Sequence, residues 1–246
     1  MRSDHIGVVV IFPWGKMALS FIASSAVQPM DQQAIESLRY PPAPWRLCGN
    51  ALILACLIDV RRARAWVPAP LRLVPIWPGK TLGGVLLANY GEGSTLRYHE
   101  LIVFPGLVRC GLRTGFWISH IYVDDLRSVR AGREMWGVPK ELAEFSWEPG
   151  SQLPARVSQQ GTDLIETAFT QSRLRVPTPL LVASMGAAGA GPRWFMGRGK
   201  ARLSWARAKV SVPAGSPFYS LGLDEPFMAF DLEAVDLWMG NIRPAC

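Results

Sequence analysis

The sequence contains few of the residues that usually hold metals, disulfide frameworks or nucleotides. Its 246 residues include four cysteines and three histidines, and neither set has the paired spacing of metal ligands. The chain also lacks a phosphate-binding glycine loop and a dinucleotide fingerprint. We therefore expect no metal and no cofactor. We also expect reduced thiols at Cys48, Cys56, Cys110 and Cys246 in a cytoplasmic protein.

Charged residues are scarce as well. They make up 18% of the chain, whereas hydrophobic residues make up 49%, a balance that excludes disorder and favours a large core or subunit contacts. The net charge of +7 could attract nucleic acid, anionic membranes or acidic substrates, but no nucleic-acid-binding motif accompanies it. We expect a small carbonyl substrate or an apolar ligand as partner, no nucleic acid, and a homo-oligomer.

The N-terminal region has no apolar run long enough to cross a membrane. Residues 7–14 are apolar, but Lys16 ends the run, so we expect no integral membrane span. A cleavable signal ending near residues 24–26 is an alternative, although Asp4 and Lys16 do not fit that pattern. We expect residues 1–29 to be a dispensable or poorly ordered extension, and residues 30–246 to form a single domain.

Short apolar segments separated by turns dominate the rest of the chain. A helical patch is expected at 61–66 and a second helix at 126–135, capped by Asp124-Asp125. The 185–191 tract is too rich in glycine and alanine to assign, and we consider it a mobile loop. So many short strands with one or two helices predict a mainly antiparallel closed barrel or cone. The expected strands are 51–60, 82–90, 100–112, 116–123, 144–147, 155–159, 164–170, 201–212 and 227–232.

Residues 132–141, Gly-Arg-Glu-Met-Trp-Gly-Val-Pro-Lys-Glu, are the most informative segment. They place Lys140 among apolar neighbours, where an ammonium group is poorly solvated. A solvated lysine amine is uncharged in about one molecule in a few thousand at neutral pH, and burial favours that nucleophilic form. The segment thus indicates a lysine that can condense with a ketone. An ordinary surface lysine is the alternative, typical of an isolated Pro-Lys-Glu triplet.

The same segment resembles the active-site signature of the acetoacetate decarboxylase family, in which Gly-Arg-Glu and a few mostly apolar residues precede Pro-Lys. The resemblance implies a closed β architecture with the lysine pointing into its interior. It also implies that Lys140 forms a Schiff base with a β-keto acid, and that the protonated imine accepts the electrons released as carbon dioxide leaves. That family is the standard example of a lysine activated by desolvation or by a neighbouring cation. Such chemistry needs no cofactor.

Two departures from the family pattern bear on the substrate. Acetoacetate-specific members carry a second lysine where this chain has Glu141, although strand alternation would point Glu141 away from the pocket and leave activation to desolvation alone. Their additional arginine and second glutamate correspond to Leu57 and to Val85 or its neighbours. A larger or less charged ketone or aldehyde, with aldol or dehydration chemistry, therefore becomes an alternative.

Glu100 is the second catalytic candidate. The Tyr98-His99-Glu100 segment resembles the family's Tyr-x-Glu, and the apolar residues 101–104 that follow would bury the carboxyl group. A buried carboxyl group can serve as a general acid or base. A structural carboxylate satisfied by an arginine or by backbone amides is the alternative.

The remaining candidates are neighbours of these two. Arg133 and Glu134 belong to the signature, although an Arg-Glu pair at a helix end is often structural, and His120 is expected to be a core histidine. The pocket-lining candidates also fit ordinary core packing. The expected substrate-binding residues are Tyr98, Arg133, Glu134, Met135 and Trp136.

A second resemblance covers residues 41–110. The Pro44-Trp45 pair, the 71–74 segment Leu-Arg-Leu-Val, the glycine-containing 81–90 strand and Glu100-Leu101 are similar to the neoxanthin-deficient proteins of plants. This likeness implies a role connected with xanthophylls. It makes a non-catalytic or accessory binding protein for a large apolar ligand the main alternative to an enzyme.

Overall fold

A computed structural model describes residues 39–148, 151–172, 174–188 and 191–246. These residues fall in one compact unit, Leu38–Cys246. The expected extension at residues 1–29 lies outside the described residues, so it stays a prediction, as does the domain boundary at residue 30. Within the described ranges, no helix has the length and apolarity needed to cross a bilayer.

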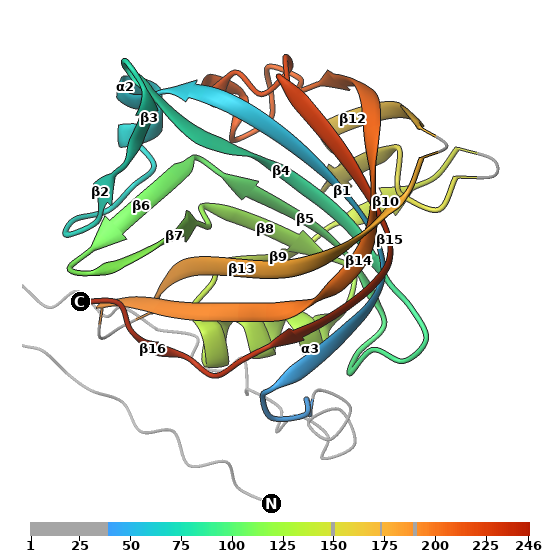
Figure 1. Cartoon of the computed structure of the whole chain (residues 1–246), viewed down its shortest axis with the longest axis horizontal. Coiled ribbons are helices and arrows are strands. Elements are labelled where there is room, and N and C mark those ends of the chain that lie inside the picture. The colour runs from blue at the N-terminus through green and yellow to red at the C-terminus, as the bar shows by residue number, and fades with distance from the viewer. Residues whose placement is uncertain (1–38, 149–150, 173, 189–190) are drawn as a thin grey trace, which may run out of the picture. The chain divides into compact units, whose positions relative to one another are not determined.

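One 16-stranded sheet dominates the structure, and it curves strongly (Figure 1). Its hydrogen-bonded order is β2-β6-β7-β13-β14-β15-β1-β4-β5-β8-β9, with further strands paired to its members. All pairs are antiparallel except β13 with β7 and β8 with β9. The strands are β1 (Trp45–Asp59), β2 (Arg72–Leu73), β3 (Pro75–Trp77), β4 (Lys80–Tyr90), β5 (Tyr98–Phe104), β6 (Gly106–Cys110), β7 (Arg113–Trp117), β8 (His120–Val123), β9 (Lys140–Leu142), β10 (Glu144–Ser146), β11 (Arg156–Gln159), β12 (Thr162–Gln171), β13 (Val176–Ala188), β14 (Gly191–Ser211), β15 (Met228–Met239) and β16 (Arg243–Pro244).

The mainly antiparallel β class predicted from the sequence is confirmed, but closure into a barrel or cone is not. The hydrogen-bonded path ends at β2 on one side and at β9 on the other, and these two strands do not pair within the described residues. A barrel needs every strand paired on both edges. The observed sheet is therefore curved and open.

Helices occupy three short regions of the described residues. The first, α2 (Val60–Arg64), starts at Asp59, whose carboxylate accepts from the Arg61 amide. The second, α3 (Leu126–Ala131), starts at Asp125 in the same way and continues as a π-helix, η1 (Gly132–Trp136), which Gly137 ends with a φ of 65°. A third, η2 (Tyr219–Leu221), is a single 3-10 turn. The sequence predicted one regular helix over 126–135, and the change to π geometry at Gly132 was not predicted.

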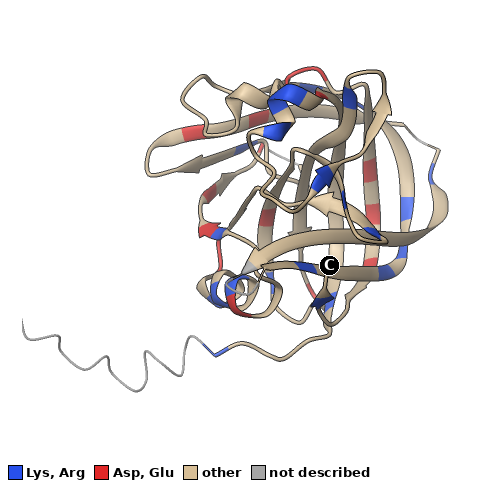
Figure 2. Cartoon of the chain, turned by 90° about the vertical axis from the view of Figure 1, so that its left-hand side faces the viewer, with Lys and Arg blue, Asp and Glu red and all other residues tan. Residues whose placement is uncertain are grey.

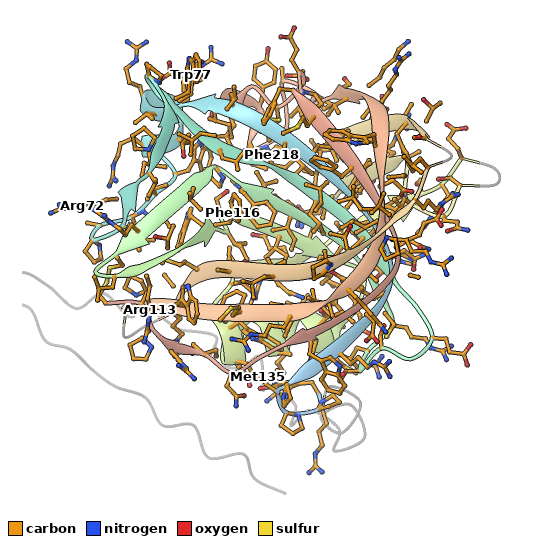
Figure 3. All side chains as sticks on the ribbon, in the orientation of Figure 1. Arg72, Trp77, Arg113, Phe116, Met135 and Phe218 are labelled. Carbon is orange, nitrogen blue, oxygen red and sulfur yellow. A yellow bond between two sulfur atoms is a disulfide. The ribbon has the colours of Figure 1, made fainter. Side chains whose placement is uncertain are left out.

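The sheet has an apolar core on each face, because successive side chains in a strand point to opposite sides. On β1, Ala51 belongs to one core together with Trp136 and Val138. The next residue, Leu52, belongs to the other core with Leu101 and Phe218. Phe218 is labelled in Figure 3, as is Phe116 on β7. We call the face that carries Ala51 and Trp136 the site face.

The interpretation of residues 185–191 as a mobile loop is wrong for the residues that are described. Residues 185–188 are the last part of β13, and β14 begins at Gly191 and runs antiparallel to it. Small residues are needed here because a Cβ atom at Gly186 would lie 2.9 Å from the Trp136 carbonyl oxygen and 2.8 Å from that of Gly137. The tract is thus a strand packed tightly against residues 136–138.

The expectation of four reduced cysteines is also wrong. Cys110, at the end of β6, forms a disulfide with Cys246, and the two Cα atoms are 5.2 Å apart. The two residues are 136 positions apart in the sequence, so local spacing could not reveal the pair. Cys48 and Cys56 are free, and desolvation by burial raises the pKa of the Cys56 thiol to about 12.

Charge is distributed over many elements. Figure 2 shows both basic and acidic positions along the strands. Within the described ranges, no group of three or more His, Cys, Asp or Glu residues is placed to hold a metal ion.

Candidate active site

Lys140 is the first residue of β9, and its side chain is buried. Only 4% of the residue is exposed. Its Nζ atom donates to Glu100 Oε1 and to Ser128 Oγ, each at 2.8 Å, and lies 4.7 Å from the centre of the Tyr98 ring. The lysine therefore belongs to a buried polar cluster and is not a surface charge.

Glu100 completes this cluster from β5. Its residue exposure is also 4%, and its second oxygen, Oε2, accepts from the Tyr90 hydroxyl at 3.2 Å. Desolvation raises the pKa values of Tyr90 and Tyr98 well above their usual range, and the nearby Glu100 carboxylate raises them further. Both phenols therefore stay protonated, which leaves the Tyr90 hydroxyl as a donor to Glu100.

The signature residues Gly132 and Arg133 explain how the lysine is positioned. A Cβ atom on Gly132 would lie 2.5 Å from Lys140 Cδ and 2.7 Å from Cγ, so only glycine leaves room for the lysine stem. Arg133 Nε donates to the Lys140 carbonyl oxygen at 2.7 Å. The exposed Arg133 side chain thus anchors the backbone of β9, whereas the sequence made it a substrate-binding candidate.

The next signature residues divide between surface and interior. Glu134 is exposed, accepts from Arg130 Nε at 2.8 Å and binds the Tyr40 hydroxyl; these hydrogen bonds lower its pKa, that from Tyr40 having the larger effect. Met135, within η1, is half-buried (Figure 3). Neither lines the cavity at Lys140, whereas Trp136 does. The Trp136 ring packs edge-on against Trp45, with centroids 5.0 Å apart.

A cavity of about 110 Å³ lies next to the Lys140 side chain. Among the described residues, its only charged lining groups are Lys140 and Glu100; the other walls are apolar apart from Tyr90, Tyr98 and Ser184. No arginine lines it within that set. Leu57, which stands where acetoacetate-specific members carry an arginine, is 39% exposed and does not line the cavity.

A larger hollow of about 520 Å³ lies elsewhere, beside residues 151–155 and β12. It contains no lysine and does not reach the Lys140 cluster. The smaller cavity is the candidate site because it holds the reactive groups.

Glu141 and His120 lie outside the cavity. Glu141 is exposed and accepts from Gln159 Nε2 at 2.9 Å, so it faces away from Lys140 as strand alternation predicted. His120 is half-buried, with Nδ1 2.9 Å from Ser119 Oγ and its ring 4.8 Å from that of Trp66. Desolvation lowers the His120 pKa, which keeps the imidazole neutral in its aromatic surroundings.

Two members of the cluster were not identified from the sequence. Ser128 lies on α3, is fully buried and contacts Lys140 Nζ; its place three residues after the Asp125 cap was an available signal. Tyr90 ends β4 on the site face, two and four residues from Ala88 and Leu86. The alternation of that strand was the signal that could have placed it in the cavity.

Comparisons with known proteins found a family profile and several curated relatives. A family profile described as "Acetoacetate decarboxylase (ADC)" matches residues 25–187. Protein NEOXANTHIN-DEFICIENT 1 of Oryza sativa subsp. japonica is 37% identical over 103 residues, which cover 42% of this chain and 34% of that protein. Acetoacetate decarboxylase of Ralstonia nicotianae is 30% identical over 111 residues, which cover 44% of this chain and 42% of that protein. The chain thus spans well under half the length of these curated relatives.

Two solved structures resemble the fold. Acetoacetate decarboxylase from Legionella pneumophila has a TM-score of 0.57 and 18% identity, covering 83% of this chain and 88% of that one. The enduracididine biosynthesis enzyme MppR, complexed with pyruvate, has a TM-score of 0.57 and 15% identity, covering 84% of this chain and 91% of that one. At this identity the likeness shows the fold alone.

Proposed function

The chain belongs to the acetoacetate decarboxylase family, and on that premise we propose that it is a cofactor-independent lyase that forms a Schiff base on Lys140. A β-keto acid is the proposed substrate class. One observation carries the proposal: Lys140 Nζ is buried, lies 2.8 Å from Glu100 Oε1, and is the only amine among the described residues that line this mainly apolar cavity. Such a pair can exchange a proton without solvent.

The Lys140–Glu100 pair provides the acid and base for imine formation. The carboxylate accepts a proton from the ammonium group, and the neutral amine then attacks the keto carbon. A proton passes from the nitrogen of the adduct to its oxygen, and Glu100 then gives its own proton to the resulting carbinolamine hydroxyl, which leaves as water. The product is a protonated imine on Lys140 beside the Glu100 carboxylate.

The surroundings then favour loss of carbon dioxide. The bond between the α carbon and the carboxylate breaks, and its electron pair moves to the imine nitrogen, giving a neutral enamine. Apolar walls disfavour the substrate carboxylate more than neutral carbon dioxide, and the Tyr98 ring face stabilises the positive charge of the imine. The enamine carbon takes up a proton, and water hydrolyses the imine to free the lysine and the ketone.

The uncharged walls and the relatives support two further candidates. A Schiff base with another carbonyl compound would allow aldol or dehydration chemistry at the same lysine. Relatives that include NEOXANTHIN-DEFICIENT 1 favour a non-catalytic protein that binds a large apolar, xanthophyll-related ligand. Homo-oligomerisation and a cytoplasmic location also stay predictions.

The first test is intact-mass measurement after borohydride reduction with acetoacetate and a panel of ketones and aldehydes. Wild type should gain the mass of the reduced adduct, mapped to Lys140, and Lys140→Ala should not. Lys209→Ala removes an exposed lysine of β14 and should react like wild type. A folded protein that forms no adduct with any carbonyl compound would overturn the lyase and favour apolar-ligand binding.

A further inference from the structure

A row of side chains leads from Lys140 across six strand-to-strand steps. Directly opposed residues of neighbouring strands point to the same face of a sheet. The strand registers place one residue of each strand in this row. Starting at Lys140, the row comprises Ile121, Ile102, Leu86, Ile53, Phe230 and Trp205, which we call the apolar row.

The apolar row runs from the cavity to the surface. Ile121 and Ile102 are buried and line the cavity, and Leu86 lines it while half-buried. Ile53 and Phe230 are half-buried. Trp205 is 57% exposed, and its ring centroid lies 4.7 Å from that of Phe230. The row therefore passes from buried residues through half-buried ones to an exposed tryptophan.

The flanking positions on the same face are almost free of charge. Two residues away along each strand lie Ala51, Ala88 and Leu232 on one side and Ala55, Gly84 and Met228 on the other. Among the described flanking residues, the charged groups are Glu100, at the lysine end, and Arg207, two residues from Trp205 on β14 at the outer end. Six inter-strand steps correspond to about 29 Å measured along the sheet.

The outer end of the apolar row is exposed at the point where β14 changes its pairing partner. β13 pairs with β14 only as far as Leu203, and β12 pairs with it from Ala206 onward. Trp205 lies between these two regions. Core packing accounts for Ile121 and Ile102, but it does not account for a tryptophan exposed at the end of a continuous apolar strip, and such patches often mark binding sites.

From these observations we infer that the carbonyl compound that reacts with Lys140 carries a linear apolar tail, which lies along Leu86, Ile53, Phe230 and Trp205. The reactive carbonyl occupies the small cavity, and the tail leaves it over Leu86. This inference rests on the proposed Schiff-base function and specifies its substrate class. The row is continuous with the cavity, and its lack of charge suits a hydrocarbon chain better than a polar extension.

A homologous series of methyl ketones tests the inference. Propanone, 2-decanone, 2-eicosanone and 2-tetracosanone would be trapped with borohydride on the full chain, because only the longest tails can extend from Lys140 to Trp205. The ketone concentration that gives half-maximal adduct would be measured by intact mass. Each methylene that becomes buried should lower that concentration roughly threefold to fourfold. In Trp205→Ala the gain for the longest ketones should shrink at least tenfold, whereas the propanone value should not change.

Trp238→Ala is the matched control. Trp238 is 49% exposed on the adjacent strand β15, but it lies between Leu237 and Met239, which line the cavity, so it points to the other face. This variant should retain the chain-length dependence. Thermal unfolding would verify that both variants fold, and size-exclusion chromatography would compare their assembly.

The outcomes separate this inference from the function on which it rests. Propanone adducts with no dependence on chain length would overturn the apolar tail while leaving the Schiff base intact. The apolar tail would also be overturned if Trp205→Ala changed the oligomeric state and left the chain-length dependence intact. Trp205 would then be covered by a second copy of the chain. Absence of adducts from every ketone would overturn both proposals.

Discussion

Gly132 lies so close to the Lys140 side chain that the position has no room for a Cβ atom. Replacing it with alanine would put a Cβ atom 2.5 Å from Lys140 Cδ, so the lysine side chain must move. Displacements of about 1 Å can cost on the order of 100-fold in rate, and we expect adduct formation by Gly132→Ala to slow 10- to 100-fold. Stopped borohydride trapping with acetoacetate measures that rate.

Gly91→Ala is the control for this substitution, because an added Cβ there has no heavy atom within 4 Å. It should react at the wild-type rate. An unchanged rate in Gly132→Ala would show that the lysine stem does not need the space that the glycine leaves.

Glu100 can be tested as a proton carrier separately from its role as a hydrogen-bond partner. Glu100→Gln keeps an oxygen to accept from Lys140 but cannot take a proton, so we expect kcat to fall about 10²- to 10⁴-fold with a smaller change in KM. Glu141→Gln is matched, because that carboxylate is adjacent in sequence yet bound to Gln159 outside the cavity. Loss of activity in both variants, or in neither, would contradict the role of Glu100.

Sequence reasoning reached Lys140 and Glu100 because their motifs are local. It did not reach Ser128 or Tyr90, because Tyr90 meets Glu100 through the pairing of β4 with β5 and Ser128 meets Lys140 through the docking of α3. Arg133 and Glu134 were selected for their place in the signature. Their bonds to the Lys140 carbonyl and to Arg130 depend on the π-helical turn, which no residue pattern indicated.

At the scale of elements, α3 carries Ser128 to the lysine, and Asp125 fixes where that helix starts. The Asp125 carboxylate accepts from the amides of Arg127 and Ser128. Asp125→Ala should cost about 0.5–2 kcal/mol of unfolding free energy and also slow adduct formation, because Ser128 is in the first turn. Asp125→Asn retains a capping oxygen and should keep most of the stability and most of the rate of adduct formation.

Asp59→Ala is the comparison for that prediction. Asp59 caps α2 through the Arg61 amide, and α2 does not contribute to the cavity. Denaturant unfolding should show a similar loss of stability in Asp59→Ala. Borohydride trapping should show an unchanged rate of adduct formation. If both cap variants lose activity equally, the coupling between α3 and the lysine is wrong.

Strands were predicted best where alternation was clear. The 82–90 and 164–170 segments agree with β4 (Lys80–Tyr90) and β12 (Thr162–Gln171). The hairpin of β13 and β14 was largely missed, because its prolines, glycines and alanines resemble a loop when tertiary contacts are ignored. Gly186 illustrates the reason, since its smallness serves a close approach to the Trp136 carbonyl and not backbone mobility.

At the scale of the whole molecule, the Cys110–Cys246 disulfide links the C-terminus to β6. Removing a native disulfide typically costs about 2–5 kcal/mol, and we expect Cys110→Ser to lose stability in that range. Cys48→Ser, which removes a free thiol, should have little effect. Equilibrium unfolding in denaturant, without reductant, measures both.

Alkylation followed by mass measurement provides an independent check. The native chain should be labelled at Cys48 and not at Cys56, because Cys56 is 2% exposed and its pKa is about 12. Unfolding without reductant should expose two reactive thiols; four would show that the disulfide is absent. Because disulfides persist mainly in oxidising compartments, the same assay on freshly lysed cells also tests the cytoplasmic prediction.

The pairing of β9 with β8 has a consequence for how this site can change. Lys140 opposes Ile121 and faces the cavity, whereas Glu141 opposes Tyr122 and faces outward. A slip of one residue exchanges the two faces of a strand, so deleting a single residue between Gly132 and Lys140 would bring Glu141 opposite Ile121, in the place of Lys140 and beside Glu100. The cavity would then hold two acidic groups that must share a proton. The length of this eight-step connection, and not its composition, thus decides whether the pocket presents an amine or an acid.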